Sequence, residues 1–398
     1  MYYSYMDFSF QIKAKDKKTR ARLGVIKTPH GEIQTPAYTP VATTATVKAL
    51  DTEDIIQSRS QVVLANTYHL LLRPGLEVIK EFGGFAPFMK WDGPTITDSG
   101  GYQVSFLRTQ GKELVVGSER EAEIVKITDE GATFRSYVDG SKQLITPERS
   151  MEIQSVLNAD IIMAFDQPLA FSDSHKKLTD SIRRTFLWEE RSFKAWEEIQ
   201  KKRKNFQALY GIVQGQLDRK VRRGFMQFIL DTGFPGIAVG DQTIGVDPKI
   251  TGQALDTIVD MIPDDKPVHA LGLGGGPEGV FEAVIRGVDT FDNTSVTRIA
   301  RSGLLYIYPE DGGTKKNKFR LDVTKKVTSN KKQAISKICQ CYTCQNYSAA
   351  YLHHLLVARE LSGFRLASIH NVHFMNDLME RIRQSLENND FQVLKKEW

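Results

Sequence analysis

Ala208-Leu-Tyr-Gly-Ile-Val-Gln-Gly215 and, after a helix-like segment, Gly236-Ile-Ala-Val-Gly-Asp241 are the stretches that decide the fold. Each is a short apolar run that ends in a polar residue or glycine. Runs of this kind are typical of parallel strands buried on both faces. The segment 218–231 between them has helical spacing and begins with Asp218, a favoured helix cap. The pair therefore predicts a strand–helix–strand unit.

The same apolar pattern recurs over the first 300 residues, at 37–43, 62–69, 95–100, 161–167, 208–215, 236–241, 268–274 and 288–293. Helical spacing and helix-start signals occur at 51–60, 147–158, 178–202, 218–231, 247–262 and 277–286. Strands that alternate with helices predict an α/β fold, and eight such units favour a closed (β/α)8 TIM barrel. A doubly wound open sheet is the alternative.

One unit is interrupted by residues 112–145, where Val, Ile and Phe alternate with charged residues. Turn signals occur at Asp129-Glu-Gly131 and at Asp139-Gly140. This pattern predicts an inserted antiparallel hairpin or small sheet at about 108–146.

The chain has three cysteines, all in the run Cys339-Gln-Cys-Tyr-Thr-Cys344. Closely spaced thiolates can supply three of the four ligands of a tetrahedral zinc ion. An odd number of cysteines in a long chain excludes a disulfide scaffold, and three reduced thiols without a metal are the alternative. We therefore predict that Cys339, Cys341 and Cys344 bind zinc.

A histidine downstream is expected to be the fourth zinc ligand. We favour His370, because His353 would lie on a helix at about 347–360, too near the thiols in sequence to fold back easily. A break at Gly363 is expected to let the chain return to the thiols. We predict a barrel with an N-terminal extension over residues 1–303, followed at 304–398 by a basic zinc-binding subdomain and helices that pack on the barrel.

Composition indicates an intracellular globular enzyme, with 398 residues, 41% hydrophobic residues and 25% charged residues. No apolar run approaches the roughly 20 residues of a membrane helix, and residues 1–10 lack the pattern of a secretory signal. The expected location is the cytoplasm, with no membrane partner. Between Thr314 and Lys337, nine Lys or Arg residues accompany one acid, Asp322. This segment predicts either a solvated face or contact with nucleic acid.

Polar residues that end the apolar runs are the candidate active-site residues, because active sites of barrels lie at the carboxyl ends of the strands. Several carboxylates without His or Lys indicate acid–base and nucleophilic chemistry at an acetal-like carbon. Taken alone, each Asp could instead cap a helix. Gly272-Leu-Gly-Gly-Gly276 fits a tight turn better than a phosphate loop. The candidates are Asn66, Asp98, Asp166, Gln214, Asp241 and Asp292.

Together these motifs resemble the queuine-type tRNA-guanine transglycosylases over nearly the whole chain. The resemblance depends on Asn66-Thr-Tyr-His-Leu, Thr97-Asp-Ser-Gly-Gly-Tyr-Gln103, Phe165-Asp166, Gly211-Ile-Val-Gln-Gly215, Val288-Asp-Thr-Phe-Asp292, Thr297-Arg-x-x-Arg-x-Gly303, the three cysteines and His370-Asn371. This family is a zinc-containing (β/α)8 barrel.

The resemblance implies base exchange in queuosine biosynthesis. Guanine at the wobble position of tRNAs with a GUN anticodon would be replaced by a 7-deazaguanine, queuine or preQ1, through a covalent glycosyl-aspartate. Asp292 would be the nucleophile and Asp98 the general acid and base. Family members work as homodimers. The resemblance also assigns base binding to Asp166, Gln214, Gly240, Tyr102 and Ser99, RNA binding to Arg298 and Arg301, and structural zinc to Cys339, Cys341, Cys344 and His370.

The sequence departs from the family pattern mainly near base recognition. Gly240 is followed by Asp241-Gln-Thr-Ile-Gly-Val246, where a second Gly, a Leu and a nearby Glu are usual. Gln167-Pro168 replaces an acidic and a small residue, Val296 replaces a Pro, and the loop 274–277 has an extra residue. Loss of the Glu would remove a partner for the aminomethyl cation of preQ1. We therefore expect queuine, or another 7-deazaguanine, to be preferred over preQ1.

Three other functions would also fit parts of this sequence. A transglycosylase acting on DNA would use the same chemistry on another polymer. A non-catalytic RNA-binding paralogue would keep the fold without turnover. A glycoside hydrolase would use paired carboxylates in a barrel, but zinc and the basic segment would have no role in it.

Overall fold

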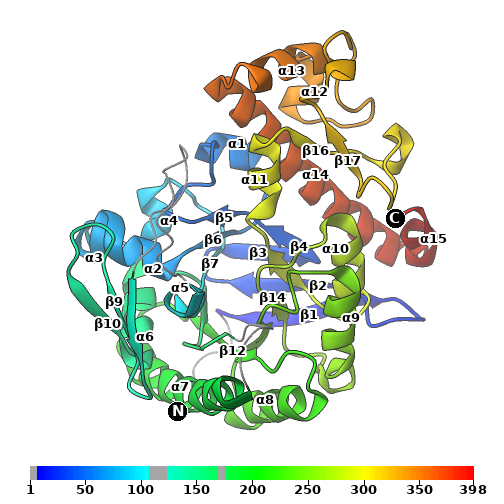
Figure 1. Cartoon of the computed structure of the whole chain (residues 1–398). Helices are drawn as coiled ribbons and strands as arrows, with labels where there is room; N and C mark the ends of the chain where they lie inside the picture. Colours follow the sequence, from blue (N-terminus) through cyan, green and yellow to red (C-terminus); the bar gives the residue numbers. More distant parts are fainter. Residues whose placement is uncertain (1–6, 107–122, 169–174) are drawn as a thin grey trace.

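The computed structural model describes residues 7–106, 123–168 and 175–398, and its centre is a closed parallel barrel (Figure 1). The strand order is β4-β15-β14-β13-β12-β11-β7-β6-β5. Pro40 separates β4 from β5, and its carbonyl accepts from Leu64 N at 3.0 Å, so the two form one strand that closes the sheet. The TIM barrel is confirmed and the open sheet is wrong. The strands are β4 (Ala37–Thr39), β5 (Val41–Ala42), β6 (Val63–Ala65), β7 (Thr95–Thr97), β11 (Ile161–Met163), β12 (Ala208–Val213), β13 (Gly236–Val239), β14 (Val268–Ala270) and β15 (Thr290–Asp292).

Helices surround the barrel where helical spacing predicts them. Asp218 caps its helix as expected, since its side chain accepts from the backbone N–H groups of Lys220 and Val221. The predicted helices are α1 (Thr52–Gln57), α6 (Pro147–Leu157), α7 (His175–Gln200), α8 (Arg219–Thr232), α9 (Pro248–Asp256) with the 3-10 turn η2 (Val259–Met261), and α10 (Gly276–Val284). Short helical segments fill the early loops: α2 (Thr67–Leu70), η1 (Leu71–Gly75), α3 (Leu76–Glu81), α4 (Phe85–Phe88) and α5 (Gly101–Phe106).

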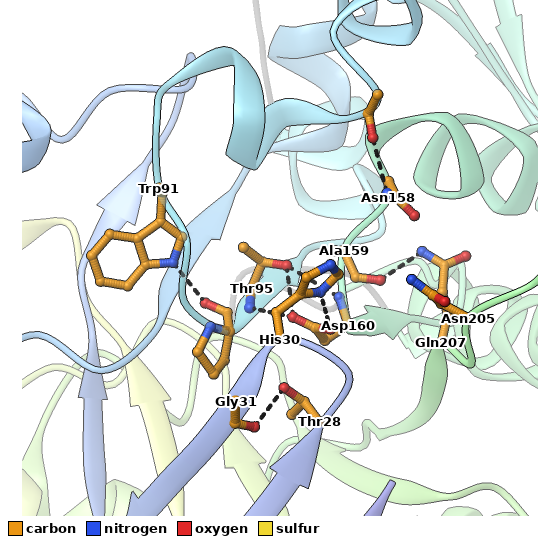
Figure 2. A network of polar contacts seen from close by, with 12 residues as sticks. Thr28, His30, Gly31, Trp91, Thr95, Asn158, Ala159, Asp160, Asn205 and Gln207 are labelled. Carbon is orange, nitrogen blue, oxygen red and sulfur yellow. Dashed lines mark hydrogen bonds and ion pairs between the residues drawn. The ribbon is translucent and has the colours of Figure 1, made fainter. Parts of the chain in front are cut away.

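An antiparallel sheet closes the amino end of the barrel. It consists of β1 (Ser9–Lys15), β2 (Arg22–Thr28) and β3 (Gly31–Thr35). Ile26 and Ile33 of this sheet are fully buried against apolar side chains that point into the barrel. Two ion pairs join the same sheet to the barrel strands. Figure 2 shows one of them, in which His30 Nδ1 lies 2.6 Å from Asp160 Oδ1 and Asp160 is also bonded to Thr95.

The inserted sheet is antiparallel, as predicted, in the order β10-β9-β8. Its strands are β8 (Glu123–Ile127), β9 (Ala132–Arg135) and β10 (Lys142–Ile145). Part of the predicted insertion, residues 107–122, lies outside the described residues. Trp188 of α7 donates its indole N–H to Asp129 O at 2.9 Å, and Arg183 pairs with the Asp129 carboxylate. The insertion is therefore attached to α7.

The C-terminal segment packs along one side of the barrel (Figure 1). The predicted break at Gly363 is wrong, because the chain turns at residues 358–360, where Arg359 has a φ of +58°. Gly363 instead lies in the first turn of α14, where a Cβ would come 2.9 Å from Leu355 Cβ. The elements are α11 (Ser295–Arg301), β16 (Leu304–Tyr306), η3 (Pro309–Asp311), β17 (Arg320–Asp322), η4 (Lys326–Thr328), α12 (Tyr342–Asn346), α13 (Ala349–Val357), α14 (Leu361–Glu387) and α15 (Phe391–Glu397).

Helix α14 joins this segment to the barrel. Arg365 pairs with the buried Asp54 at 2.6 Å, and Arg383 donates to Pro36 O at 2.6 Å. One hydrophobic core contains residues of both segments, so the division at residue 303 stays a prediction. Among the described helices, none is long and apolar enough to cross a membrane.

Candidate active site and metal centre

The carboxyl ends of the barrel strands carry Asp98, Asp166 and Asp292. Asp98 follows β7, Asp166 follows β11, and Asp292 is the last residue of β15. Asp98 and Asp292 lie near enough for the charge of Asp292 to raise the pKa of Asp98. The structure thus brings the two residues predicted for chemistry to one mouth, while their roles stay predictions.

Asp98 is held by neutral groups. Its carboxylate accepts from Asn66 Nδ2 and, at 2.8 Å, from Thr67 N. Asn66 is also the N-cap of α2, through the N–H of His69. Burial is the main reason why the pKa of Asp98 is raised to about 7, and the nearby charge of Asp292 adds to it. A carboxyl with this pKa can both give and take a proton near neutral pH.

Asp292 is oriented by two donors on one oxygen. Its Oδ1 accepts from Gly272 N at 2.8 Å and lies 3.3 Å from His269 Nε2. The glycine-rich loop forms a turn here, with φ of +67° at Gly272 and +81° at Gly275. Both bonds are to Oδ1, so Oδ2 is the oxygen that would attack if Asp292 is the predicted nucleophile.

Asp166 forms a second polar group beside this pair. Its Oδ1 accepts from Ser99 Oγ at 2.8 Å and its Oδ2 from Gln214 Nε2 at 2.6 Å. Burial raises its pKa to about 6. Glycine is needed at two neighbours: a Cβ on Gly101 would lie 2.6 Å from Asp166 Oδ1, and one on Gly240 would lie 2.9 Å from Gln214 Nε2. The predicted base-binding residues therefore cluster together.

Helix α7 keeps Asp166 and Gln214 in position through contacts that the sequence did not indicate. The β11–β12 ladder ends with Ala164 N bonded to Tyr210 O. Beyond it, Ser192 Oγ accepts from Phe165 N, and Glu189 Oε1 accepts from Ile212 N at 2.9 Å. Burial raises the pKa of Glu189 well above its usual value. Side chains of α7 thus replace strand pairing just before Asp166 and Gln214, the two residues predicted to bind the base.

Asp241 does not belong with the open carboxylates. Its side chain is fully buried and pairs with Arg222 at 3.1 Å. It also accepts from Gln216 N and from Thr243 N, both at 2.7 Å. These bonds hold the divergent 240–246 loop and leave the Asp241 carboxylate without the open position that Asp292 has, so its active-site candidacy stays a prediction that its partners do not favour. The alternative that Asp241 or Asp166 caps a helix is not supported, because neither is the N-cap of a described helix.

The predicted stacking and RNA-binding residues lie around the mouth. Tyr102 is 55% exposed in the first turn of α5, which directly follows Asp98-Ser-Gly-Gly. Arg298 is exposed and Arg301 half-buried on α11, the helix that begins three residues after Asp292. Gln167 is held by Arg184 Nη1 at 2.5 Å.

The three cysteines and His370 form a buried cluster whose ligand atoms all lie within 4.8 Å of one another. His370 Nδ1 lies 3.8, 3.5 and 3.3 Å from the sulfurs of Cys339, Cys341 and Cys344. A tetrahedral zinc ion would separate sulfur and nitrogen ligands by about 3.6 Å. These residues therefore fit a metal ion, and His370 lies where the predicted fourth ligand is required.

The residues behind the cluster connect it to the mouth. His370 Nε2 lies 2.7 Å from Tyr306 O, which fixes Nδ1 toward the thiols. The next residue, Asn371, donates to Val296 O in α11 at 3.0 Å and accepts from Tyr306 N. The metal centre thus supports α11, the helix that carries Arg298. The lysines of the segment 314–337 are all exposed.

Comparison with known proteins agrees with this geometry. The family model described as queuine tRNA-ribosyltransferase matches residues 16–398. The chain belongs to the queuine tRNA-ribosyltransferase family. A protein named queuine tRNA-ribosyltransferase from Desulforudis audaxviator is 37% identical over 393 residues, 99% of this chain and 98% of the relative. One of the same name from Staphylococcus haemolyticus is 40% identical over 370 residues, 93% of this chain and 90% of the relative.

Membership of the queuine tRNA-ribosyltransferase family excludes the glycoside hydrolase as the best description. His269, Glu189 and Ser192 were not predicted from the sequence. His269 had a visible signal, because it is a polar residue inside the apolar run 268–274. The α7 residues had none, since their partners lie far away in sequence.

Proposed function

We propose that the protein is a tRNA-guanine transglycosylase that exchanges guanine at the wobble position of GUN-anticodon tRNAs for a 7-deazaguanine. One observation carries this proposal: two carboxylates at one barrel mouth have different surroundings. Asp98 accepts hydrogen bonds from neutral groups and has a pKa of about 7. Asp292 accepts a hydrogen bond from Gly272 N on Oδ1, which directs Oδ2 toward the substrate. Different surroundings suit different duties in one reaction.

In the first half-reaction, Asp292 Oδ2 attacks C1′ of the ribose. The bond from C1′ to guanine breaks, its electrons leave with the base, and Asp98 gives the base a proton. The product is a glycosyl ester on Asp292. Because this ester keeps the free energy of the glycosidic bond, no ATP is needed to attach another base.

In the second half-reaction, Asp98 takes a proton from the incoming base. The nitrogen of that base then attacks C1′ and displaces Asp292. The base would be bound by Asp166, Gln214 and the backbone at Gly240, with Ser99 orienting Asp166. Tyr102 would stack on it, since an exposed ring beside the site gives stacking of about 1 to 3 kcal/mol.

We propose that the metal is zinc and that it is structural. The Cys3His donor set and tetrahedral spacing support zinc, which would hold α14 against α11. Cys344→Ser should lower both zinc content and thermal stability, and should weaken tRNA binding through Arg298. Metal analysis by mass spectrometry measures the first effect, and a variant with full zinc content would contradict the assignment.

The anticodon loop is the proposed RNA partner. Its phosphates would contact Arg298, Arg301 and the exposed lysines of the segment 314–337. We also propose a homodimer, supported by a partly exposed aromatic cluster in which the half-buried Tyr347 ring stacks on the exposed Tyr351 ring at 5.5 Å. Light scattering should give a dimer for the wild type and a monomer for Tyr351→Ala.

For the inserted base, we propose queuine in preference to preQ1. In place of the second Gly that usually follows Gly240, this chain has Asp241, whose charge is neutralised by Arg222. That carboxylate is therefore not available to an aminomethyl cation, which supports a base other than preQ1. Equal or better use of preQ1 in competition with queuine would contradict this preference.

The test is incorporation of labelled guanine into an unmodified GUN-anticodon tRNA, chased separately with queuine and preQ1. Asp292→Ala is the inactive control, and a matched DNA substrate tests the DNA-acting alternative. Incorporation into tRNA that queuine chases supports the proposal. Incorporation into DNA alone, or none by zinc-loaded protein, would favour the DNA-acting enzyme or the non-catalytic paralogue.

A further inference from the structure

The barrel interior is polar directly below Asp292. On most strands the inward positions are apolar, as at Leu64, Ile96 and Met163. On β14 and β15 they are His269 and Thr290, which are neighbours in the strand register and at most 1% exposed. Burying such groups is costly unless they are hydrogen-bonded, so their partners indicate what they do.

These residues form a line of bonds that ends at Asp292. His269 Nδ1 lies 2.9 Å from Thr290 Oγ1, and its Nε2 lies 3.3 Å from Asp292 Oδ1. An ionised carboxylate only accepts hydrogen bonds, so Nε2 must carry the proton when Asp292 is charged. In the neutral ring Nδ1 then accepts from the Thr290 hydroxyl. The Thr290 hydroxyl can donate to Nδ1 and therefore stabilises the tautomer that lets His269 donate to Asp292.

We propose that His269 is a positioning residue for Asp292. By donating a hydrogen bond to this carboxylate, His269 helps Asp292 to leave C1′ in the second half-reaction. The inference rests on the proposed function. His269 Nε2 and Gly272 N both bind Oδ1, which turns Oδ2 toward the substrate. His269 does not act on the substrate itself.

The two donors favour the charged form of Asp292 over the glycosyl ester. Hydrogen bonds to an ionised acceptor are roughly twice as strong as those to a neutral one. When the ester breaks, negative charge returns to Asp292 and both donors stabilise it. Removal of His269 should therefore shift the balance toward the ester and slow its breakdown.

The test uses His269→Phe, which removes the donor, and His269→Gln, which restores a side-chain N–H. With tRNA and a fixed concentration of guanine, the SDS-stable protein–tRNA adduct is measured on gels. For His269→Phe we expect about a fivefold higher ratio of adduct to free enzyme and about a tenfold lower kcat for guanine exchange. KM for guanine should be unchanged, and His269→Gln should recover most of the loss.

A matched control is His353→Phe, since His353 also makes a hydrogen bond through a ring nitrogen, to Val323 O at 2.7 Å, but lies in the C-terminal segment. It should leave the adduct ratio unchanged. A His269→Phe enzyme with the wild-type adduct ratio, or a lower ratio that Gln does not restore, would overturn the proposal. If the wild type itself exchanges no guanine, the proposed function fails instead. If His269→Phe does not fold, the adduct ratios of His269→Gln and Thr290→Val are compared instead. A raised ratio in Thr290→Val alone supports the proposal. Wild-type ratios in both variants overturn it.

Discussion

Aspartates at the two ends of the barrel differ in their partners. At the amino end, Asp289 accepts two bonds from Arg22, at 2.9 and 2.6 Å, and one from Val268 N. Asp160 at the same end bonds His30 and Thr95 (Figure 2). At the carboxyl end, Asp98 and Asp292 accept hydrogen bonds from neutral groups, such as Thr67 N and Gly272 N, and neither forms an ion pair with an Arg or Lys among the described residues. We therefore expect the carboxylates that are paired with a cation to stabilise the fold, and the two that have only neutral partners to carry out the chemistry.

Asp241 shows that the partners, and not the end of the barrel, make this difference. It lies at the mouth, yet Arg222 and backbone donors saturate it. Its bonds hold the 240–246 loop. Charge partners therefore distinguish structural from reactive carboxylates better than position alone does.

The largest effect is expected for Asp292→Ala. Loss of the nucleophile should lower exchange by at least about 10⁴-fold, because no glycosyl ester can form. The adduct should disappear from gels, while thermal melting stays near that of the wild type. Residual exchange above about 1% of the wild-type rate would show that Asp292 is not the nucleophile.

At the opposite end, Asp289→Asn should lower stability and leave catalysis intact. The substitution leaves Arg22, which is 3% exposed, without its charge partner. Breaking such a buried pair costs about 3 to 5 kcal/mol of unfolding free energy. Urea unfolding measures this cost, and kcat per folded molecule should stay within about twofold. A variant with normal stability but impaired kcat would contradict a structural role for the carboxylates at the amino end of the barrel.

The pKa of Asp98, about 7, should give the two half-reactions opposite pH dependences. Release of guanine needs protonated Asp98, so its rate should fall as pH rises above about 7. Attack by the incoming base needs ionised Asp98, so that rate should fall as pH drops below about 7. Each limb should approach tenfold per pH unit. Single-turnover assays separate the two steps, and equal slopes in both would contradict a dual role.

Sequence predicted the strands well because each carries a local signal, an apolar run that ends in a polar residue. The same signal located Asp98, Asp166 and Asp292. It could not locate Glu189 or Ser192, whose bonds to Ile212 and Phe165 depend on how α7 packs. Nor could it distinguish Asp241 from the others, because Arg222 meets it through tertiary folding.

The turn before Gly363 was misplaced for a related reason. Glycine commonly breaks a helix, but here it lets α13 and α14 approach closely at Leu355. In the turn itself, Arg359 has a φ of +58°, a conformation that is uncommon for arginine and that the sequence therefore does not predict. Local propensity therefore failed where packing between helices decides the conformation.

The smallest effect is expected at His30, which closes the amino end without any role in chemistry. Its hydrogen bond to Asp160 raises the pKa of His30 above 6.5, so the folded state binds its proton more tightly than the unfolded state. The resulting stability is fully present below pH 6.5 and is lost as pH rises through the raised pKa. His30→Asn should therefore lower Tm most near pH 6 and hardly at all near pH 9. Because 41% of the side chain is exposed, the difference should be less than about 1 kcal/mol. Calorimetry of both proteins over this pH range measures it. A Tm difference independent of pH would mean that His30 contributes packing only, and that the ion pair in Figure 2 does not stabilise this end of the barrel.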